Sequence, residues 1–169
     1  MKKVILLSFL FVFFGMVHAQ ESKQSKKQKK ELAAKENMEK TRALVESKKF
    51  EFTGNFMFPQ NGQRVSMLTP PNTLKINGNT VTSNLPFIGT KQFTGANSGM
   101  MFEGDMEDYK MEFVDKKNEI RLRFKHKDGT ETFSFQLDIA PDGYTYIVAS
   151  SNKRTTITYS GNITALKEQ

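Results

Sequence analysis

The sequence E-I-R-L-R-F-K-H-K-D-G-T-E-T-F-S-F-Q-L-D-I, residues 119–139, decides the fold. Apolar and polar side chains alternate on both sides of Asp128-Gly129, which is the pattern of two half-buried strands joined by a tight turn. If Asp128-Gly129 is a two-residue loop, Phe124 faces Phe133, and the other apolar side chains of the two strands also meet. The segment therefore predicts an antiparallel hairpin with one Phe-rich face.

The preceding segment extends this pattern by one strand. A tight turn at Lys117-Asn118 places Phe113 opposite Leu122 and Tyr109 opposite His126. Apolar side chains again meet apolar ones, and the same face of the sheet continues. We therefore expect a third antiparallel strand ahead of the hairpin.

The following segment adds two more strands. Pro141-Asp142-Gly143 suits a type I turn with the glycine in a bulge, which places Ile147 opposite Leu137. The last turn, near Asn152-Lys153, is compatible with two registers, and the alternation does not choose between them. A final strand is expected at residues 155–159.

The first half of the chain carries shorter strand signals. Phenylalanines at alternating positions predict a strand in which Gly54 forms a bulge and Pro59 ends the pairing. Asn77-Gly78 between two short β-type segments is a hairpin signal. Further strands are expected at residues 64–68 and around residues 100–103. The alternating side chains of the first strand are Phe50, Phe52, Phe56 and Phe58, with Met57 between the last two.

Together these patterns predict an all-β fold, an up-and-down antiparallel meander of roughly eight or nine strands. The meander has to hide its Phe-rich face by closing into a barrel or by folding into a sandwich, and we expect a closed or nearly closed barrel. One N-terminal helix precedes the sheet, because residues 31–48 are rich in strong helix formers. The β-domain is expected at residues 49–166. The apolar face of the helix is formed by Ala34, Met38, Thr41 and Val45.

The N-terminal residues indicate export. Lys2 and Lys3 precede an apolar run from Val4 to Phe14, and Val17-His18-Ala19 offers a cleavage site with small residues at its ends. The run is shorter than the ~20 residues that a membrane-spanning helix needs, so residues 1–19 are predicted to be a signal peptide. The chain has no cysteine that could carry a lipid. We therefore expect a periplasmic or secreted protein that is not a lipoprotein.

The net charge of +7 arises before the β-domain. Residues 20–49 contain ten basic and five acidic side chains, whereas residues 50–169 contain thirteen of each. Residues 20–30 are polar and lysine-rich, which predicts a disordered tether. Because the β-domain is neutral, nucleic-acid binding is not expected, and a weak contact with an anionic surface would involve the tether. The lysines concerned are Lys23, Lys26, Lys27, Lys29 and Lys30.

One histidine, His126, remains after the predicted cleavage. In the register above it lies at the end of the inner face, between Tyr109 and Glu131 of the neighbouring strands. Such a row at the rim of a barrel could bind a small ligand or act in acid–base chemistry, since a carboxylate can orient an imidazole. It could equally be a structural set of cross-strand contacts. These three residues are the candidate ligand-binding site, with no cofactor and no assigned catalytic residue.

Other chemistries have little support. A single histidine and no cysteine disfavour a zinc site, and the chain has no G-x-S-x-G, G-x-G-x-x-G or Walker sequence. The acidic residues at 103–108 lack an EF-hand pattern, which favours a solvated loop over a calcium site. One strand carries a basic side chain at every second position, and we expect it to form a salt-bridged surface rather than a site for an anionic sugar or lipid. The four side chains are Arg121, Arg123, Lys125 and Lys127.

Two short elements carry a resemblance to a known family. Leu85-Pro86-Phe87-Ile88-Gly89, together with the closing segments 151–154 (S-N-K-R) and 158–161 (T-Y-S-G), resembles motifs of an uncharacterised family of exported proteins from Bacteroidota, domain of unknown function 4251. The similarity covers about residues 30–165, with Thr158 at a position where serine is expected. The resemblance implies an exported chain with these domain boundaries. It implies no activity and no ligand.

The sequence thus favours binding over catalysis. The preferred hypothesis is an exported envelope protein whose non-enzymatic β-domain binds a small apolar ligand or an envelope protein partner. The alternative is a hydrolase or isomerase that uses His126 with a nearby carboxylate. The alternative requires an imidazole that is open to a pocket, whereas a packed imidazole would exclude it.

Overall fold

The computed structural model describes residues 28–60, 62–70, 72–89 and 99–167. The chain divides into two compact units, residues 1–37 and residues 38–169. A helix covers residues 28–46, so it begins three residues before the expected start, and Lys29 and Lys30 are helical. The predicted signal peptide and the other tether lysines, Lys23, Lys26 and Lys27, lie outside the described residues.

In the second unit the described residues form ten strands. They are β1 (Lys49–Pro59), β2 (Val65–Ser66), β3 (Thr73–Asn77), β4 (Thr80–Pro86), β5 (Gly99–Asp105), β6 (Glu107–Val114), β7 (Glu119–Asp128), β8 (Glu131–Ile139), β9 (Tyr144–Ser151) and β10 (Arg154–Ala165). All described pairs are antiparallel. The predicted all-β fold with one preceding helix is therefore confirmed.

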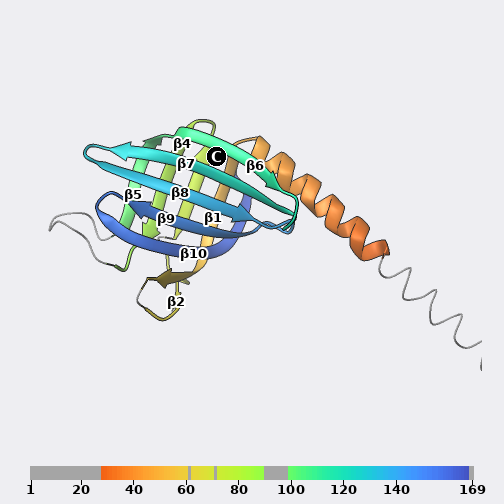
Figure 1. The fold of residues 1–169 in the computed structure, drawn as a ribbon, viewed down its shortest axis with the longest axis horizontal. Helices are drawn as coiled ribbons and strands as arrows, with labels where there is room; N and C mark the ends of the chain where they lie inside the picture. The colour runs from red at the N-terminus through yellow and green to blue at the C-terminus, as the bar shows by residue number, and fades with distance from the viewer. Residues whose placement is uncertain (1–27, 61, 71, 90–98, 168–169) are drawn as a thin grey trace, which may run out of the picture. The chain divides into compact units, whose positions relative to one another are not determined.

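The strands form one curled sheet, a half-barrel (Figure 1), with the order β5-β4-β3-β1-β10-β9-β8-β7-β6 and with β2 paired to β1. The two end strands, β5 and β6, follow each other in sequence with Met106 alone between them. They do not share a ladder in the described sheet. Instead, the Phe102 ring of β5 packs against inner side chains of β7 and β8, with its centroid 4.3 Å from that of His126 and 4.7 Å from that of Phe133.

The C-terminal part of the helix covers apolar surface of the β unit. From Met38 onward it belongs to this unit, and Val45 is completely buried in the hydrophobic core. The Thr41 hydroxyl donates a hydrogen bond of 2.7 Å to the Pro141 carbonyl in the turn between β8 and β9. These contacts, with Leu44 packed beside them, explain why this face of the helix is apolar.

In both predicted glycine hairpins the glycine occupies the first loop position rather than the second. Gly78 and Gly129 have φ angles of +63° and +58°, and the pairs that flank the loops are Asn77↔Thr80 and Asp128↔Glu131. A glycine with positive φ at the first loop position is the requirement of a type II′ turn. Both predicted hairpins exist, but the pairing predicted across Asp128-Gly129 is shifted by two residues.

A shift of two preserves the face of every side chain, because strand side chains alternate with period two. Phe124 therefore lies opposite Phe135 instead of Phe133, which lies opposite His126. All of these side chains point to the inner face and are at most 5% exposed. The Phe-rich inner face is confirmed, and the exact partners are corrected.

The predicted pairing of β6 with β7 is wrong for two reasons. The loop holds four residues, 115–118, rather than a tight turn at Lys117-Asn118, so Phe113 lies opposite Ile120. A bulge between Glu107 and Lys110 then shifts the rest of β6. The loop alone moves Tyr109 from His126 to Phe124, and the bulge places Asp108 beside Tyr109 opposite the same residue.

The later hairpins agree more closely with the sequence. Ile147 lies opposite Leu137, as the turn at residues 141–143 predicts. At the last turn Arg154 pairs with Ser151, and the register then changes by one before Ile157. The strand thus adopts one register next to the turn and another beyond the bulge.

The first strand contains the predicted bulge at Gly54. Beyond it, the side chain that turns into the core is Met57, 5% exposed, whereas Phe56 and Phe58 are half-buried. The expectation that these two phenylalanines continue the stripe of the first two is therefore wrong, because the extra residue reverses the faces. Gly161 lies opposite the bulge, where a Cβ atom would stand 2.0 Å from a backbone oxygen of β1.

Candidate functional site

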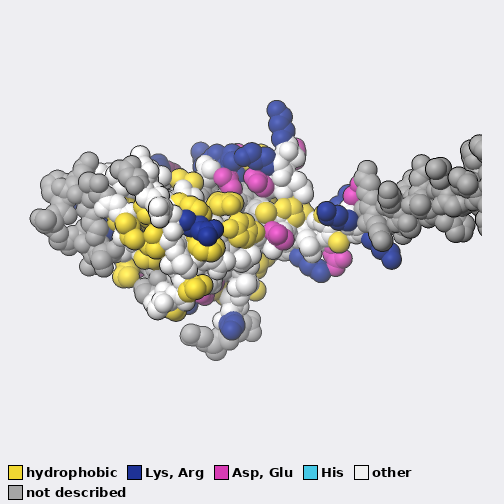
Figure 2. Space-filling view, turned by 90° about the horizontal axis from the view of Figure 1, so that it is seen from below, with side chains coloured by type: hydrophobic (Ala, Val, Ile, Leu, Met, Phe, Trp, Pro, Cys, Tyr) yellow, Lys and Arg dark blue, Asp and Glu magenta, His cyan; other side chains and the backbone are white. Residues whose placement is uncertain are grey.

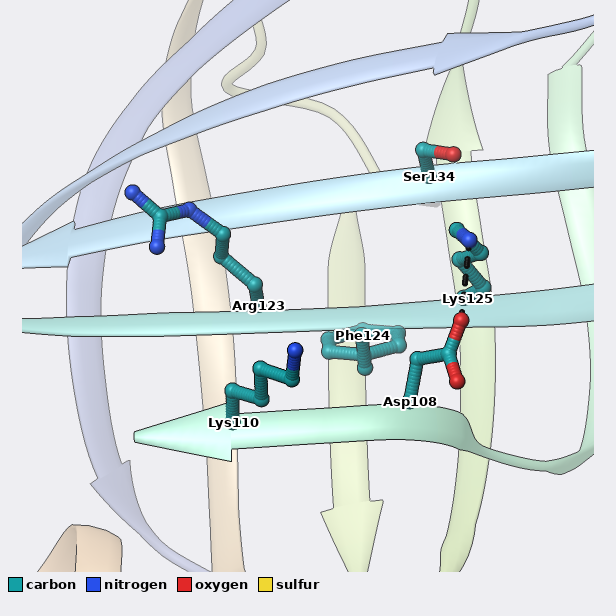
Figure 3. Close-up of a pocket in the computed structure, with 6 residues that line it drawn as sticks. All are labelled: Asp108, Lys110, Arg123, Phe124, Lys125 and Ser134. Carbon is teal, nitrogen blue, oxygen red and sulfur yellow. Dashed lines mark hydrogen bonds and ion pairs between the residues drawn. The ribbon is translucent and has the colours of Figure 1, made fainter. Parts of the chain in front are cut away.

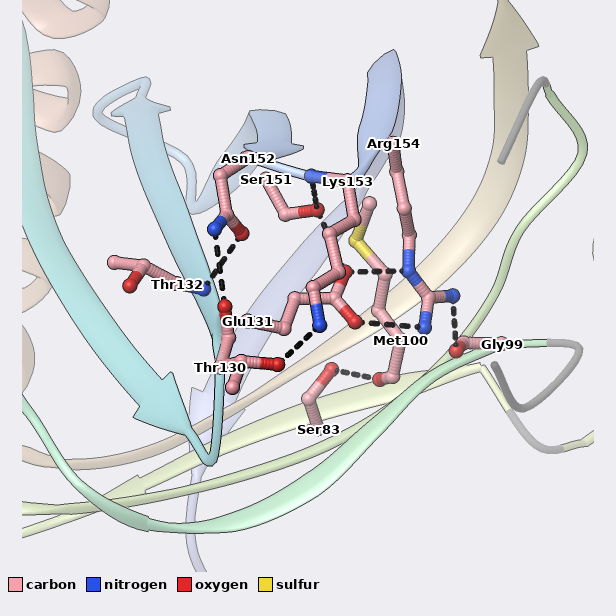
Figure 4. Close-up of polar contacts among 10 residues, drawn as sticks. All are labelled: Ser83, Gly99, Met100, Thr130, Glu131, Thr132, Ser151, Asn152, Lys153 and Arg154. Carbon is pink, nitrogen blue, oxygen red and sulfur yellow. Dashed lines mark hydrogen bonds and ion pairs between the residues drawn. The ribbon is translucent and has the colours of Figure 1, made fainter. Parts of the chain in front are cut away.

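A buried ion pair connects β10 to β8 at one end of the half-barrel (Figure 4). Arg154 Nε donates to Glu131 Oε1 at 2.7 Å and Nη2 to Oε2 at 3.3 Å, with 4% and 11% of the two side chains exposed. The Ser151 hydroxyl donates a further bond of 2.6 Å to Glu131. Burial raises the pKa of the Glu131 carboxyl, but the bonds from Arg154 and Ser151 outweigh it and hold that pKa below its usual value.

Arg154 also reaches the end strand β5. Its Nη1 donates to the Gly99 carbonyl at 2.7 Å, and its guanidinium lies 5.5 Å from the ring centroids of Phe87 and Phe133. One side chain therefore joins β5, β8 and β10, whereas in the described part of the chain no ladder joins β5 to β8 or β10. This makes Arg154 a structural clamp.

His126 has the corresponding position at the other end of β5. Its Nδ1 lies 2.9 Å from the Asp105 carbonyl oxygen, and since a carbonyl only accepts, Nδ1 carries the proton. The ring stacks on Phe102, and a Cβ atom at Gly104 would lie 2.6 Å from its Cε1. His126 is 5% exposed. The imidazole is packed and offers no open face to a substrate, so the hydrolase or isomerase hypothesis loses its central residue.

The three predicted site residues thus have separate roles. Glu131 is bound to Arg154, and His126 to the Asp105 carbonyl. The Tyr109 ring lies under the Lys48 ammonium, 4.0 Å from ring centroid to Nζ, and the buried Tyr109 hydroxyl has no hydrogen-bond partner among the residues that the structure describes. Burial raises the pKa of Tyr109. The four-residue loop between β6 and β7 is the physical reason that Tyr109 lies opposite Phe124 and not opposite His126.

Sequence reasoning missed Arg154, and the reason is local. Strict alternation back from the buried Ile157 and Tyr159 places residue 154 on the outer face, but the bulge between Arg154 and Ile157 turns it inward. Pairing across the turn with the inward-facing Ser151 was the signal that could have found it. Choosing that register would have placed an arginine beside Glu131.

The two elements that carry the family resemblance pack against each other. The Tyr159 hydroxyl donates a hydrogen bond of 2.7 Å to the Pro86 carbonyl, and Arg154 lies over Phe87. A Cβ atom at Gly89 would lie 2.6 Å from the Thr155 hydroxyl oxygen. The motifs are thus explained in part by the packing of β4 and the following residues on β10.

An open groove lies beside this contact. It has a volume of about 360 Å³, and we call it the Ile88 groove. Ile88 itself is 49% exposed although it belongs to the central motif. Hydrophobic side chains also gather in patches on the surface seen from the side of β2 and β10 (Figure 2). The lining residues of the groove are Pro59, Gln60, Gly62, Gln63, Val65, Ile88, Gly89 and Thr155.

The basic row on β7 is largely neutralised by neighbouring strands, as the sequence predicts. Arg121 binds Asp138 at 2.6 Å, and Lys125 binds Asp108 at 2.8 Å. Arg123 binds a carboxylate of β6 at 3.0 Å. Within the described ranges, no group of three histidine or acidic side chains is arranged to hold a metal ion. No helix of the described part is long and apolar enough to cross a membrane.

Comparisons with known proteins agree with this architecture. A crystal structure of a DUF4251 family protein from Bacteroides eggerthii superposes with a TM-score of 0.62 at 20% sequence identity, over 76% of this chain and 87% of that one. At this identity the likeness shows the fold. A comparison with curated proteins finds no match. The family described as a domain of unknown function, DUF4251, matches residues 32–163, most of the chain, and the protein therefore belongs to that family.

Proposed function

We propose that this chain is an exported envelope protein whose β-domain binds an apolar group, without catalysis, at the Ile88 groove. The observation that carries the proposal is the 49% exposure of Ile88 inside an open groove next to the packed family motifs. Leaving a large apolar side chain exposed forgoes the stabilisation that its burial would supply. The occupant is either a small apolar ligand or an apolar side chain of an envelope protein partner.

The interior of the half-barrel supports this role less well than the groove. Its large side chains pack against one another, as in the stacked Phe124 and Phe135 rings, 5.1 Å apart. Its polar groups are occupied by structural contacts, Arg154 with Glu131 and His126 with a carbonyl. An apolar occupant therefore has better access to the outer groove than to the inner face. Export is supported by the charged and apolar pattern of residues 1–19.

The test introduces a charge into the groove. Ile88→Glu should weaken binding of an uncharged apolar dye, N-phenyl-1-naphthylamine, by at least about tenfold, because the bound carboxylate would lose its water. The readout is dye fluorescence titrated with purified protein. Leu68→Glu is the matched control, since Leu68 is 83% exposed and does not line the groove.

The control should change the dye affinity by less than about twofold, in keeping with an exposed site. Equal loss in both variants would mean that the dye binds general apolar surface, and the groove would lose its role. To detect a protein partner, a photo-crosslinking side chain at position 88 would be compared with one at position 68 in cells. Specific adducts at position 88 alone support a partner, and the cell fraction that contains them tests export.

A further inference from the structure

A second hollow lies on the outer face where β6 separates from β7 (Figure 3). Its volume is about 290 Å³. In Figure 3 the Lys110 side chain extends from β6 toward β7, and the Asp108 carboxylate is turned toward Lys125. We call this concave region the bulge hollow. It is lined by Asp108, Lys110, Arg123, Phe124, Lys125 and Ser134.

The hollow is a direct product of the bulge. Glu107 pairs with Lys125 and Lys110 with Arg123, so two residues of β6 stand opposite Phe124 alone. Asp108 has a φ angle of +52°, a left-handed conformation that costs a residue other than glycine about 1 kcal/mol or more. Bulges re-aim side chains and are frequent beside binding sites. The strained residue thus lies at the position where the bulge opens a concave surface.

The electrostatics of the bulge hollow are unbalanced. Lys110 lies directly opposite Arg123 on the outer face, and like charges in that arrangement repel. The single lining carboxylate, Asp108, is bound to Lys125 at 2.8 Å. Arg123 is bound in turn to Glu112, which does not line the hollow, at 3.0 Å. Among the described residues Lys110 makes no ion pair, so the lining together with its partners has an excess of one positive charge.

We propose that the bulge hollow binds a phosphate monoester. A phosphate monoester carries about two negative charges at neutral pH and three strong acceptor oxygens, so it can pair with the Lys110 ammonium and accept hydrogen bonds from the neighbouring cations. Lysine and arginine are the usual donors to phosphate, and the Ser134 hydroxyl on β8 adds a neutral donor to the lining. This site shares no residue with the Ile88 groove, so each proposal stands or fails without the other.

The test titrates purified protein with inorganic phosphate at pH 8 and constant ionic strength, and follows backbone amide signals by NMR. Saturable shifts are expected at residues 108–110, 123–125 and 134. Lys110→Gln should weaken binding at least about fivefold, because a charge-assisted bond is lost. Arg123→Gln is the second variant. Lys127→Gln is the matched control, since Lys127 is a cation of the same face of β7 that does not line the hollow, and it should change the affinity less than twofold.

The source of the phosphate is distinguished by two further probes. Glycerol 1-phosphate that shifts the same signals supports a soluble ligand. Co-sedimentation with phosphatidylcholine vesicles only when they contain phosphatidic acid, lost in Lys110→Gln, supports a lipid headgroup. Two results would overturn the proposal. One is that phosphate at concentrations up to about 20 mM gives no saturable shifts. The other is that Lys110→Gln and Lys127→Gln lose the same affinity, because this would show diffuse electrostatic attraction only.

Discussion

Each end of β5 is held to the opposite side of the half-barrel by a side-chain hydrogen bond, but the chemistry of the donor differs. β5 is an end strand of the sheet, and its carbonyls at Gly99 and Asp105 accept hydrogen bonds from side chains across the half-barrel rather than from a neighbouring strand. At one end the donor is Arg154, charged and paired with Glu131. At the other end it is His126, stacked on an aromatic ring.

This difference shows how a half-barrel can be closed without a continuous ladder. The Arg154 end depends on two buried charges, each of which would be costly alone. The His126 end depends on ring packing and one hydrogen bond, which contribute less. We therefore expect perturbations at the two ends to differ in size and in their response to pH, and four predictions test this.

The largest effect is expected at the charged end. Glu131→Gln leaves Arg154 as an uncompensated buried charge, and the free energy of unfolding should fall by about 3–5 kcal/mol. Urea unfolding followed by circular dichroism measures it. The control is Glu51→Gln, which breaks the more exposed pair with Lys75 at 3.5 Å and should cost about 1 kcal/mol or less. Similar losses in both variants would contradict the clamp.

The second prediction concerns acid. Because the folded-state pKa of Glu131 lies below its usual, unfolded value, the folded state releases this proton more readily than the unfolded state. The resulting stabilisation is fully present above the unfolded pKa and is lost as the pH falls through the folded pKa. Urea unfolding between pH 6 and pH 3 should therefore show a decline that is smaller in the double variant Glu131→Leu, Arg154→Met. An unchanged decline in that variant would assign acid sensitivity to other carboxylates.

The third prediction concerns a substitution that introduces a methyl group next to the His126 imidazole. Gly104→Ala places a Cβ atom 2.6 Å from His126 Cε1, so the ring has to move off Phe102, at a cost of about 1–3 kcal/mol. Thermal unfolding gives the loss, and NMR shifts of the His126 ring protons report the lost stacking. Gly129→Ala is no suitable control because the φ angle of Gly129 is positive. The control is Glu103→Ala, because Glu103 is exposed and lies on β5 beside Gly104. A stable Gly104→Ala protein with unchanged ring shifts would contradict the packing described.

The inner face was predictable because a register error of two residues does not change which side chains face inward. The register predicted across Asp128-Gly129 was shifted by two residues, and a shift of two keeps Phe124 and Phe133 on the same face. Alternation and turn glycines thus determined the sheet and its core before any contact was known. The burial of Val45 in the core agrees with its place on the apolar face that helical spacing indicates.

The contacts of the site were not predictable, because they depend on the exact cross-strand partners and, at Arg154, on a bulge that changes the face of the side chain. The four-residue loop at residues 115–118 moved Tyr109 by two positions, from His126 to Phe124, and a one-residue change of register turned Arg154 inward. A bulge shifts a strand by one residue, and one residue is enough to reverse a face. Nothing in the alternation marks where it occurs, except at Gly54, where the glycine gave the signal.

The smallest effect is expected from His126→Phe. The phenyl ring keeps the stacking on Phe102, 4.3 Å away in the native pair, and loses only the bond to the Asp105 carbonyl. Because Asp105 is exposed, water can replace the donor, and the free energy of unfolding should fall by about 1 kcal/mol. Urea unfolding measures it, with the exposed neighbour Lys127→Ala as the control. A loss as large as that of Glu131→Gln would mean that the imidazole, and not the ion pair, holds β5 in place.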